Sequence, residues 1–92
     1  MISRASVPHL APKARLRFDR VAKGYMLLYP ERGLALEETA ADILLLCTGE
    51  NTVGAIVDQL ARKYAAPAAE VEPDVIEFLG EMVDRALVRV ES

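Results

Sequence analysis

The sequence has little of the chemistry from which catalytic and metal sites are usually built. Its 92 residues include one cysteine and one histidine, too few for an internal disulfide or for a complete set of zinc ligands. His9 and Cys47 lie far apart in the sequence, so a paired nucleophile and base is not expected. The five glycines are scattered, which leaves no loop to hold phosphates. We therefore expect no catalytic residue, no metal and no cofactor.

Long apolar runs are also missing. No segment approaches the roughly 18–20 apolar residues that cross a bilayer, and the N-terminus lacks the apolar segment of a secretory signal. We therefore expect a cytoplasmic protein with no membrane partner. The apolar content of 52% is nevertheless enough for one small folded domain. Cys47, which lies inside the apolar stretch ILLLC, is expected to be buried and unreactive.

Charge is present but divided between the two parts of the chain. Residues 1–32 carry seven basic and two acidic side chains, a net charge of +5. Residues 33–92 carry four basic and twelve acidic side chains, a net charge of −8. This division predicts a molecule that can orient a charged partner.

The first third of the chain has the hydrophobic pattern of strands. Residues 1–14 contain two prolines and no hydrophobic period, and are expected to form a flexible arm. RLRFDRV then alternates, with Leu16 and Phe18 expected to point inward. A turn with Gly24 at positive φ should lead into YMLLY, an apolar central strand. PERG reverses the chain again before LALE, so the pattern predicts a three-stranded antiparallel meander.

The remainder has helical spacing. From Glu38 the apolar positions 40, 43, 44 and 47 share one face of a first helix, and Thr52 is a suitable N-cap for a second helix that ends near Tyr64. The third helix is apolar at intervals from Val71, with a kink or a late start expected near Pro73. LVRVE at the end is predicted to be a short wing strand. Together these elements predict an α+β domain over residues 15–92, with a winged helix-turn-helix-like architecture.

A winged-helix regulator that binds DNA is the main alternative function. Its third helix would enter the major groove, but residues 70–85 carry six acidic side chains and one arginine, a local charge of −5. Duplex binding depends on neutralising phosphates, so this helix would be repelled. We therefore expect no nucleic-acid partner.

The third predicted strand suggests a different kind of partner. GLALE carries almost no charge, and an unblocked edge strand offers unpaired backbone groups to an extended chain. A peptide could add there as a fourth strand and place its side chains against Leu34, Leu36, Phe78 and Met82. Alternatively the edge is covered by the arm, by the wing, or by a second copy in a homodimer formed through strand exchange.

Three motifs combine within residues 15–88: YMLLYPER, LEETAADILLLCTG and IVDQLARKY. In this combination the chain resembles the PqqD family of pyrroloquinoline quinone (PQQ) biosynthesis. Glu37 departs from the Asp or Asn that this family tends to have as helix cap, and Tyr25 stands where Trp is frequent. A weaker cap on the first helix is the expected consequence of the first difference. Pro73 also stands where the family commonly has an ordinary helix former.

The resemblance implies a peptide chaperone, a recognition element for the precursor of a ribosomally made, modified peptide. Such a protein would bind the precursor peptide PqqA and present it to PqqE, a radical S-adenosylmethionine enzyme that joins a Glu and a Tyr side chain. The peptide would add to the third strand, against the third helix. The implied backbone partners are Gly33, Leu34, Ala35 and Leu36. The implied groove residues are Val75, Phe78, Leu79 and Met82.

Overall fold

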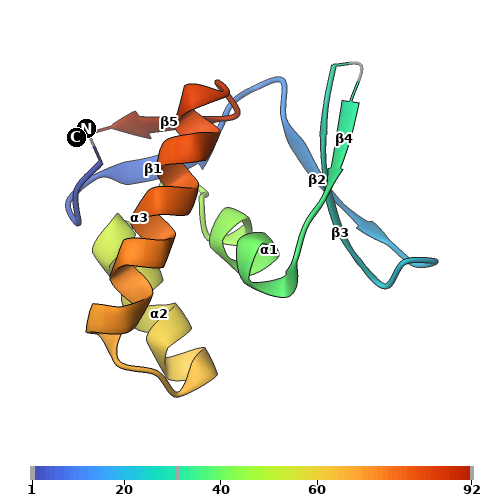
Figure 1. Cartoon of the computed structure of the whole chain (residues 1–92). Coiled ribbons are helices and arrows are strands. Elements are labelled where there is room, and N and C mark those ends of the chain that lie inside the picture. The colour runs from blue at the N-terminus through green and yellow to red at the C-terminus, as the bar shows by residue number, and fades with distance from the viewer. Residues whose placement is uncertain (1, 31, 92) are drawn as a thin grey trace.

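The computed structural model describes residues 2–30 and 32–91 and contains two antiparallel sheets and three helices (Figure 1). One sheet pairs two strands from opposite ends of the chain, β1 (Val7–Leu10) and β5 (Val88–Glu91). The other is a meander with its middle strand at the centre, formed by β2 (Arg15–Asp19), β3 (Gly24–Tyr29) and β4 (Arg32–Ala35). The helices are α1 (Glu38–Leu45), α2 (Val53–Tyr64) and α3 (Ala68–Asp84). The predicted α+β fold, a meander followed by three helices, is confirmed.

The core lies where the helices meet each other and the inner face of the meander. Each helix contributes the apolar stripe that its spacing predicts, and β3 contributes Leu27, which is fully buried. The other large core side chains are Ile43, Leu44, Val53, Ile56, Val57, Leu60, Val75, Leu79, Met82, Leu87 and Val88. α1 stands between the meander and the pair formed by α2 and α3 (Figure 1). Within the described residues, no helix is long and apolar enough to span a membrane.

The N-terminal segment is part of the domain, which corrects the prediction of a flexible arm over residues 1–14. β1 pairs with β5 along its whole length, from Val7 opposite Glu91 to Leu10 opposite Val88. The predicted wing strand therefore pairs with the start of the chain instead of extending the meander. Sequence patterns missed β1 because it is only four residues long, contains Pro8, and pairs with a strand at the far end of the chain. The domain consequently begins well before Arg15.

The same segment supplies hydrogen-bond acceptors for the start of α2. The carbonyl oxygen of Ser6 accepts a bond of 2.8 Å from Val53 N, and that of Arg4 accepts one of 3.0 Å from Gly54 N. The Thr52 side chain accepts a bond of 3.1 Å from Ala55 N, which confirms the predicted N-cap. Three backbone donors that α2 cannot satisfy internally thus have partners.

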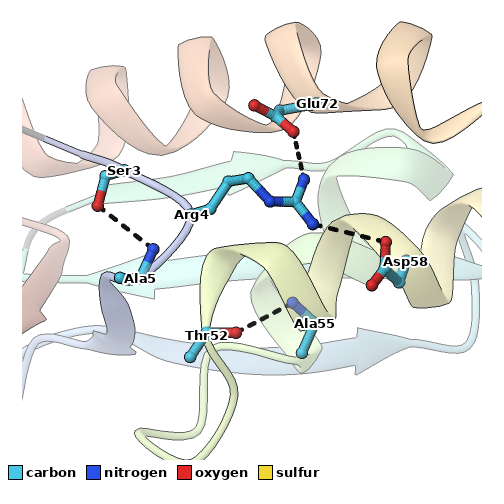
Figure 2. A network of polar contacts seen from close by, with 7 residues as sticks. All are labelled: Ser3, Arg4, Ala5, Thr52, Ala55, Asp58 and Glu72. Atoms are coloured by element: carbon cyan, nitrogen blue, oxygen red, sulfur yellow. Dashed lines mark hydrogen bonds and ion pairs between the residues drawn. The ribbon is translucent and has the colours of Figure 1, made fainter.

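The Arg4 side chain also joins two helices. Figure 2 shows its guanidinium reaching between Asp58 on α2 and Glu72 on α3. The distance from Arg4 Nη2 to Asp58 Oδ1 is 3.8 Å, and Arg4 Nη1 donates a hydrogen bond to Glu72 Oε1. This arginine from the predicted arm is therefore occupied by contacts within the fold.

The tip of the first hairpin differs from the prediction in two respects. Lys23, with φ of 57°, adopts the left-handed conformation that was expected of Gly24. Phe18, expected to point inward, is 51% exposed and packs edge-to-face on Tyr25, with ring centroids 5.3 Å apart. The hairpin tip extends beyond the helices, so the inner face of the meander is covered only in part.

The starts of α1 and α3 test two predictions that were made from single residues, Glu37 and Pro73. Glu37 makes no side-chain hydrogen bond at the start of α1, as expected for a weak cap. α3 begins at Ala68 and includes Pro73, so the predicted late start is wrong. A proline inside a helix loses one internal hydrogen bond. Ala68 and Val71 are half-buried and pack against the core from the first turns of α3, which favours the earlier start.

A polar cluster connects α1 to the end of α2. Lys63 Nζ donates a hydrogen bond of 2.8 Å to Asp42 Oδ2, the Tyr64 hydroxyl donates to the same oxygen, and Lys63 Nζ lies 3.6 Å from Glu38. Burial tends to raise the pKa of Asp42, but the bonds from Lys63 and Tyr64 outweigh it and hold that pKa below its ordinary value. The bond to Asp42 also raises the pKa values of Lys63 and Tyr64.

Replacing Asp42 with asparagine should lower the free energy of unfolding at neutral pH by about 1 kcal/mol, because a charged acceptor is lost. A carboxyl group with a lowered folded-state pKa contributes stability above its unfolded-state pKa, and that contribution disappears as the pH falls through the folded-state value. The difference between Asp42→Asn and the parent should therefore vanish in acid. Urea unfolding of the parent and the variant, at neutral pH and in acid, measures this difference in unfolding free energy. Asp74→Asn, the same change at an exposed site, is the control, and equal effects of both variants would contradict the assignment.

Candidate functional site

β4 is the edge of the meander that carries few charges. The strand order is β2-β3-β4, so β4 has one neighbour within the described sheet. Its register on β3 places Leu34 opposite Leu27, with Gly33 opposite Leu28 and Ala35 opposite Met26. The other edge, β2, exposes Arg15 and Arg17. Charged side chains of this kind protect an edge against pairing, and β4 has only Arg32.

The alternation of hydrogen bonds along the β3–β4 ladder determines which backbone N–H and C=O groups of β4 point away from β3 and can bind a partner. Leu36 N donates a bond of 3.0 Å to Tyr25 O, just beyond the end of β4. In an antiparallel ladder, hydrogen-bonded pairs alternate with pairs that are not bonded to each other. The N–H and C=O groups of Leu34 and the N–H of Leu36 therefore face β3, and the N–H and C=O groups of Gly33 and Ala35 face outward. Of the four residues predicted to pair with a peptide backbone, only Gly33 and Ala35 therefore have both backbone groups directed away from β3.

The side chains of β4 alternate in the complementary way. Leu34 and Leu36 are half-buried and pack against the core, whereas Gly33 and Ala35 are exposed. A Cβ atom added at Gly33 would lie 3.2 Å from Leu28 Cδ2 and 3.2 Å from Met26 Cε, so a larger residue would have to displace those side chains. Small residues thus keep the outward backbone groups accessible.

α3 supplies one residue of the predicted groove at an accessible position. Val75, Leu79 and Met82 are at most 2% exposed and belong to the core, which differs from the prediction that they line an open groove. The apolar stripe of α3 is wide, and its most central positions pack inward. Phe78 is half-buried at the margin of the core.

The position of Phe78 around α3 distinguishes it from the other half-buried residues. At about 100° per residue, Phe78 lies roughly 60° to one side of Val75, and Glu72 and Val83 lie on the opposite side. That opposite side is occupied by the N-terminal segment, because Glu72 binds Arg4 and Val83 faces a hollow with Ala11, Val88 and Val90. Phe78 is therefore on the flank of α3 away from the N-terminal segment.

Cys47, the residue considered as a nucleophile, is buried within the fold. Cys47 is 4% exposed, its thiol donates to the carbonyl oxygen of Ile43 at 3.2 Å, and burial raises its pKa to about 12. The prediction of a buried thiol is confirmed, and a thiol with this pKa is almost entirely protonated at neutral pH. His9 lies closer to it than the sequence suggested, because β1 forms a bridge from His9 to Thr48. Among residues 2–30 and 32–91, no cluster of three or more His, Cys, Asp or Glu side chains is placed to hold a metal.

Comparison with known proteins identifies the family of the chain. The family model described as "Coenzyme PQQ synthesis protein D (PqqD)" matches residues 24–88. A "PqqA binding protein" of Rhodopseudomonas palustris (strain BisB5) is 44% identical over 95% of this chain and 85% of its own length. A "Bifunctional coenzyme PQQ synthesis protein C/D" of Methylorubrum extorquens is 36% identical over 94% of this chain and 23% of its own length.

A solved structure agrees with these sequence relatives. The solution NMR structure of the PqqD part of Methylobacterium extorquens PqqCD, described as a stand-alone recognition element for a ribosomally synthesised, modified peptide, has a TM-score of 0.83. It is 35% identical and covers 97% of this chain and 95% of its own. The family model, the sequence relatives and the fold agree: this chain belongs to the PqqD family.

Proposed function

We propose that this protein is a peptide chaperone in PQQ biosynthesis that binds the precursor peptide PqqA by strand addition at β4. The observation that carries the proposal is the outward direction of the Gly33 and Ala35 backbone groups on an uncharged stretch of edge strand. The name of the Rhodopseudomonas relative, a PqqA binding protein, supports the choice of peptide.

Backbone pairing and side-chain contacts would have separate roles in this complex. Hydrogen bonds to Gly33 and Ala35 are available to any extended chain, so they supply affinity without choosing a sequence. Side chains of the added strand alternate between the two faces of the sheet. Those on the inner face would meet Leu34 and Leu36, with Phe78 as the contact from α3, and those contacts would select the peptide.

The chaperone would present PqqA to the radical S-adenosylmethionine enzyme PqqE without taking part in the chemistry. We assign no catalytic residue, since the sole thiol is buried and protonated. A cytoplasmic location would put the protein where a ribosomal peptide is made. A second copy could use the same edge through strand exchange, so a homodimer of that kind would compete with the peptide.

The proposal predicts direct binding and a dependence of the enzyme reaction on this protein. Isothermal titration with PqqA should give binding in the micromolar range, about −8 kcal/mol, and a scrambled peptide of the same composition should bind at least about tenfold more weakly. PqqE should join the Glu and Tyr side chains of PqqA, measured by mass spectrometry, only when this protein is present. Equal affinity for both peptides, or full cross-linking without this protein, would contradict the proposal. Retention on duplex DNA at low salt would favour the regulator instead.

A further inference from the structure

The outer face of the meander carries a basic row beside an apolar row. Because side chains alternate along a strand, the face away from Leu27 holds Arg15 and Arg17 of β2 beside Leu28 and Met26 of β3. Both arginines are exposed, and Met26 and Leu28 are half-buried although the core lies on the other face. This face is thus apolar at its centre and cationic along one side.

A hollow opens at the hairpin end of this face. It has a volume of about 600 Å³, and its lining combines apolar residues with two arginines and one aspartate, a net charge of +1. The lining residues are Arg17, Phe18, Asp19, Arg20, Val21, Met26 and Leu28. Val21 is 94% exposed, so a large apolar side chain is presented to solvent at its rim, beside the half-buried Met26 and Leu28. Apolar groups presented together in this way are typical of interaction sites.

The cations of the meander have no carboxylate partner within the described residues. All ion pairs found in residues 2–30 and 32–91 are made by Arg4 and Lys63, which lie outside the meander. The meander itself exposes five basic side chains, and Asp19 offsets only part of their mutual repulsion. They are Arg15, Arg17, Arg20, Lys23 and Arg32. An acidic partner would remove this repulsion.

We propose that the outer face of the meander docks an acidic surface of a second protein, which inserts an apolar side chain into the hollow beside Val21. This inference rests on the proposed function, because the partner it fits is the enzyme that receives the peptide. A strand added to β4 would lie about 10 Å from β3, two strand spacings away. A protein held over Met26 and Leu28 would therefore be next to the bound peptide without covering the β4 edge.

The composition of the hollow favours a protein over a nucleic acid. Single-stranded nucleic acids bind to aromatic platforms on which bases stack. Here the face offers Met26, Leu28 and Val21, which are not aromatic, and Phe18 is packed against Tyr25 on the opposite face of the ladder. The rest of the chain, residues 33–92, has a net charge of −8 and would repel a polyanion, whereas an acidic protein patch can be limited to the meander.

Charge reversal tests the inference. The double variant Arg17→Glu, Arg20→Glu should bind purified PqqE at least about tenfold more weakly than the parent, measured by biolayer interferometry at low salt. The affinity of the same variant for PqqA alone should stay within about twofold. Arg62→Glu reverses one charge on α2, away from this face, and is the control for a general charge effect. Val21→Ser removes an exposed apolar side chain without changing the charge, so it tests the hydrophobic contact. Val21→Ser should weaken PqqE binding and Arg62→Glu should not.

The outcomes separate this inference from the proposed function. Unchanged PqqE affinity in the double variant, or no binding of PqqE by the parent, would overturn the docking surface while PqqA binding stands. A loss of PqqA affinity in the double variant would assign the face to the peptide and also overturn it. If duplex or single-stranded DNA bound the parent and was released by the double variant, the occupant would be a nucleic acid. Failure of the parent to bind PqqA would instead overturn the proposed function.

Discussion

Replacing Ala35 with proline should weaken PqqA binding by about tenfold or more and leave the protein folded. Proline removes the outward N–H of Ala35, and its ring would meet the incoming strand. One lost hydrogen bond accounts for about 0.5–1.5 kcal/mol, and the steric conflict adds to it. The fold should tolerate the change because this N–H makes no bond to β3, and edge strands accept proline at such positions. Isothermal titration gives the affinity, and circular dichroism checks the fold.

Two neighbouring variants make this result specific. Ala35→Val keeps the N–H and adds bulk, so it should bind PqqA much better than Ala35→Pro. Leu34→Pro removes an N–H that faces β3, so it should destabilise the meander itself. An Ala35→Pro protein that is folded and binds PqqA as tightly as the parent would exclude strand addition at this position.

Replacing Leu79 with alanine should have the largest effect on stability. Leu79 is fully buried on α3, and truncating a buried leucine typically costs about 2–5 kcal/mol of unfolding free energy, including the cavity left behind. Urea unfolding measures this loss. The protein that remains folded should bind PqqA with little change, because Leu79 is not at the surface.

Phe78→Ala on the adjacent position provides the contrast. Phe78 is half-buried at the margin of the core, so its truncation should weaken PqqA binding more than Leu79→Ala does and destabilise the fold less. If Leu79→Ala abolished peptide binding at full stability, Leu79 would line the groove after all. The pair thus decides which residues of α3 belong to the core and which to the site.

The sequence predicted those parts of the fold that depend on local spacing. The apolar stripes of α1 and α2 and the cap at Thr52 follow from a period near four and from one hydroxyl before the helix. The bare edge at β4 followed from the lack of charge around Leu34. Each of these features can be predicted from residues that are close together in the sequence.

The sequence could not predict features that depend on distant partners. β1 is a strand because β5 lies beside it, and nothing in residues 7–10 indicates that partner. The wide apolar stripe of α3 did not show that Val75 and Leu79 face inward while Phe78 lies at the margin, since that depends on how the helix is rotated in the fold. The outward direction of the Gly33 and Ala35 backbone groups likewise depends on the register of β4 on β3.

Hydrogen exchange of the β4 amides tests strand addition most directly. In the free protein the amides of Gly33 and Ala35 should exchange rapidly, whereas those of Leu34 and Leu36, which face β3, should be protected. On addition of PqqA, NMR-detected exchange should slow at Gly33 and Ala35 and change little at Leu34 and Leu36. Strand addition at β4 would be contradicted if a saturated complex left Gly33 and Ala35 exchanging as fast as in the free protein.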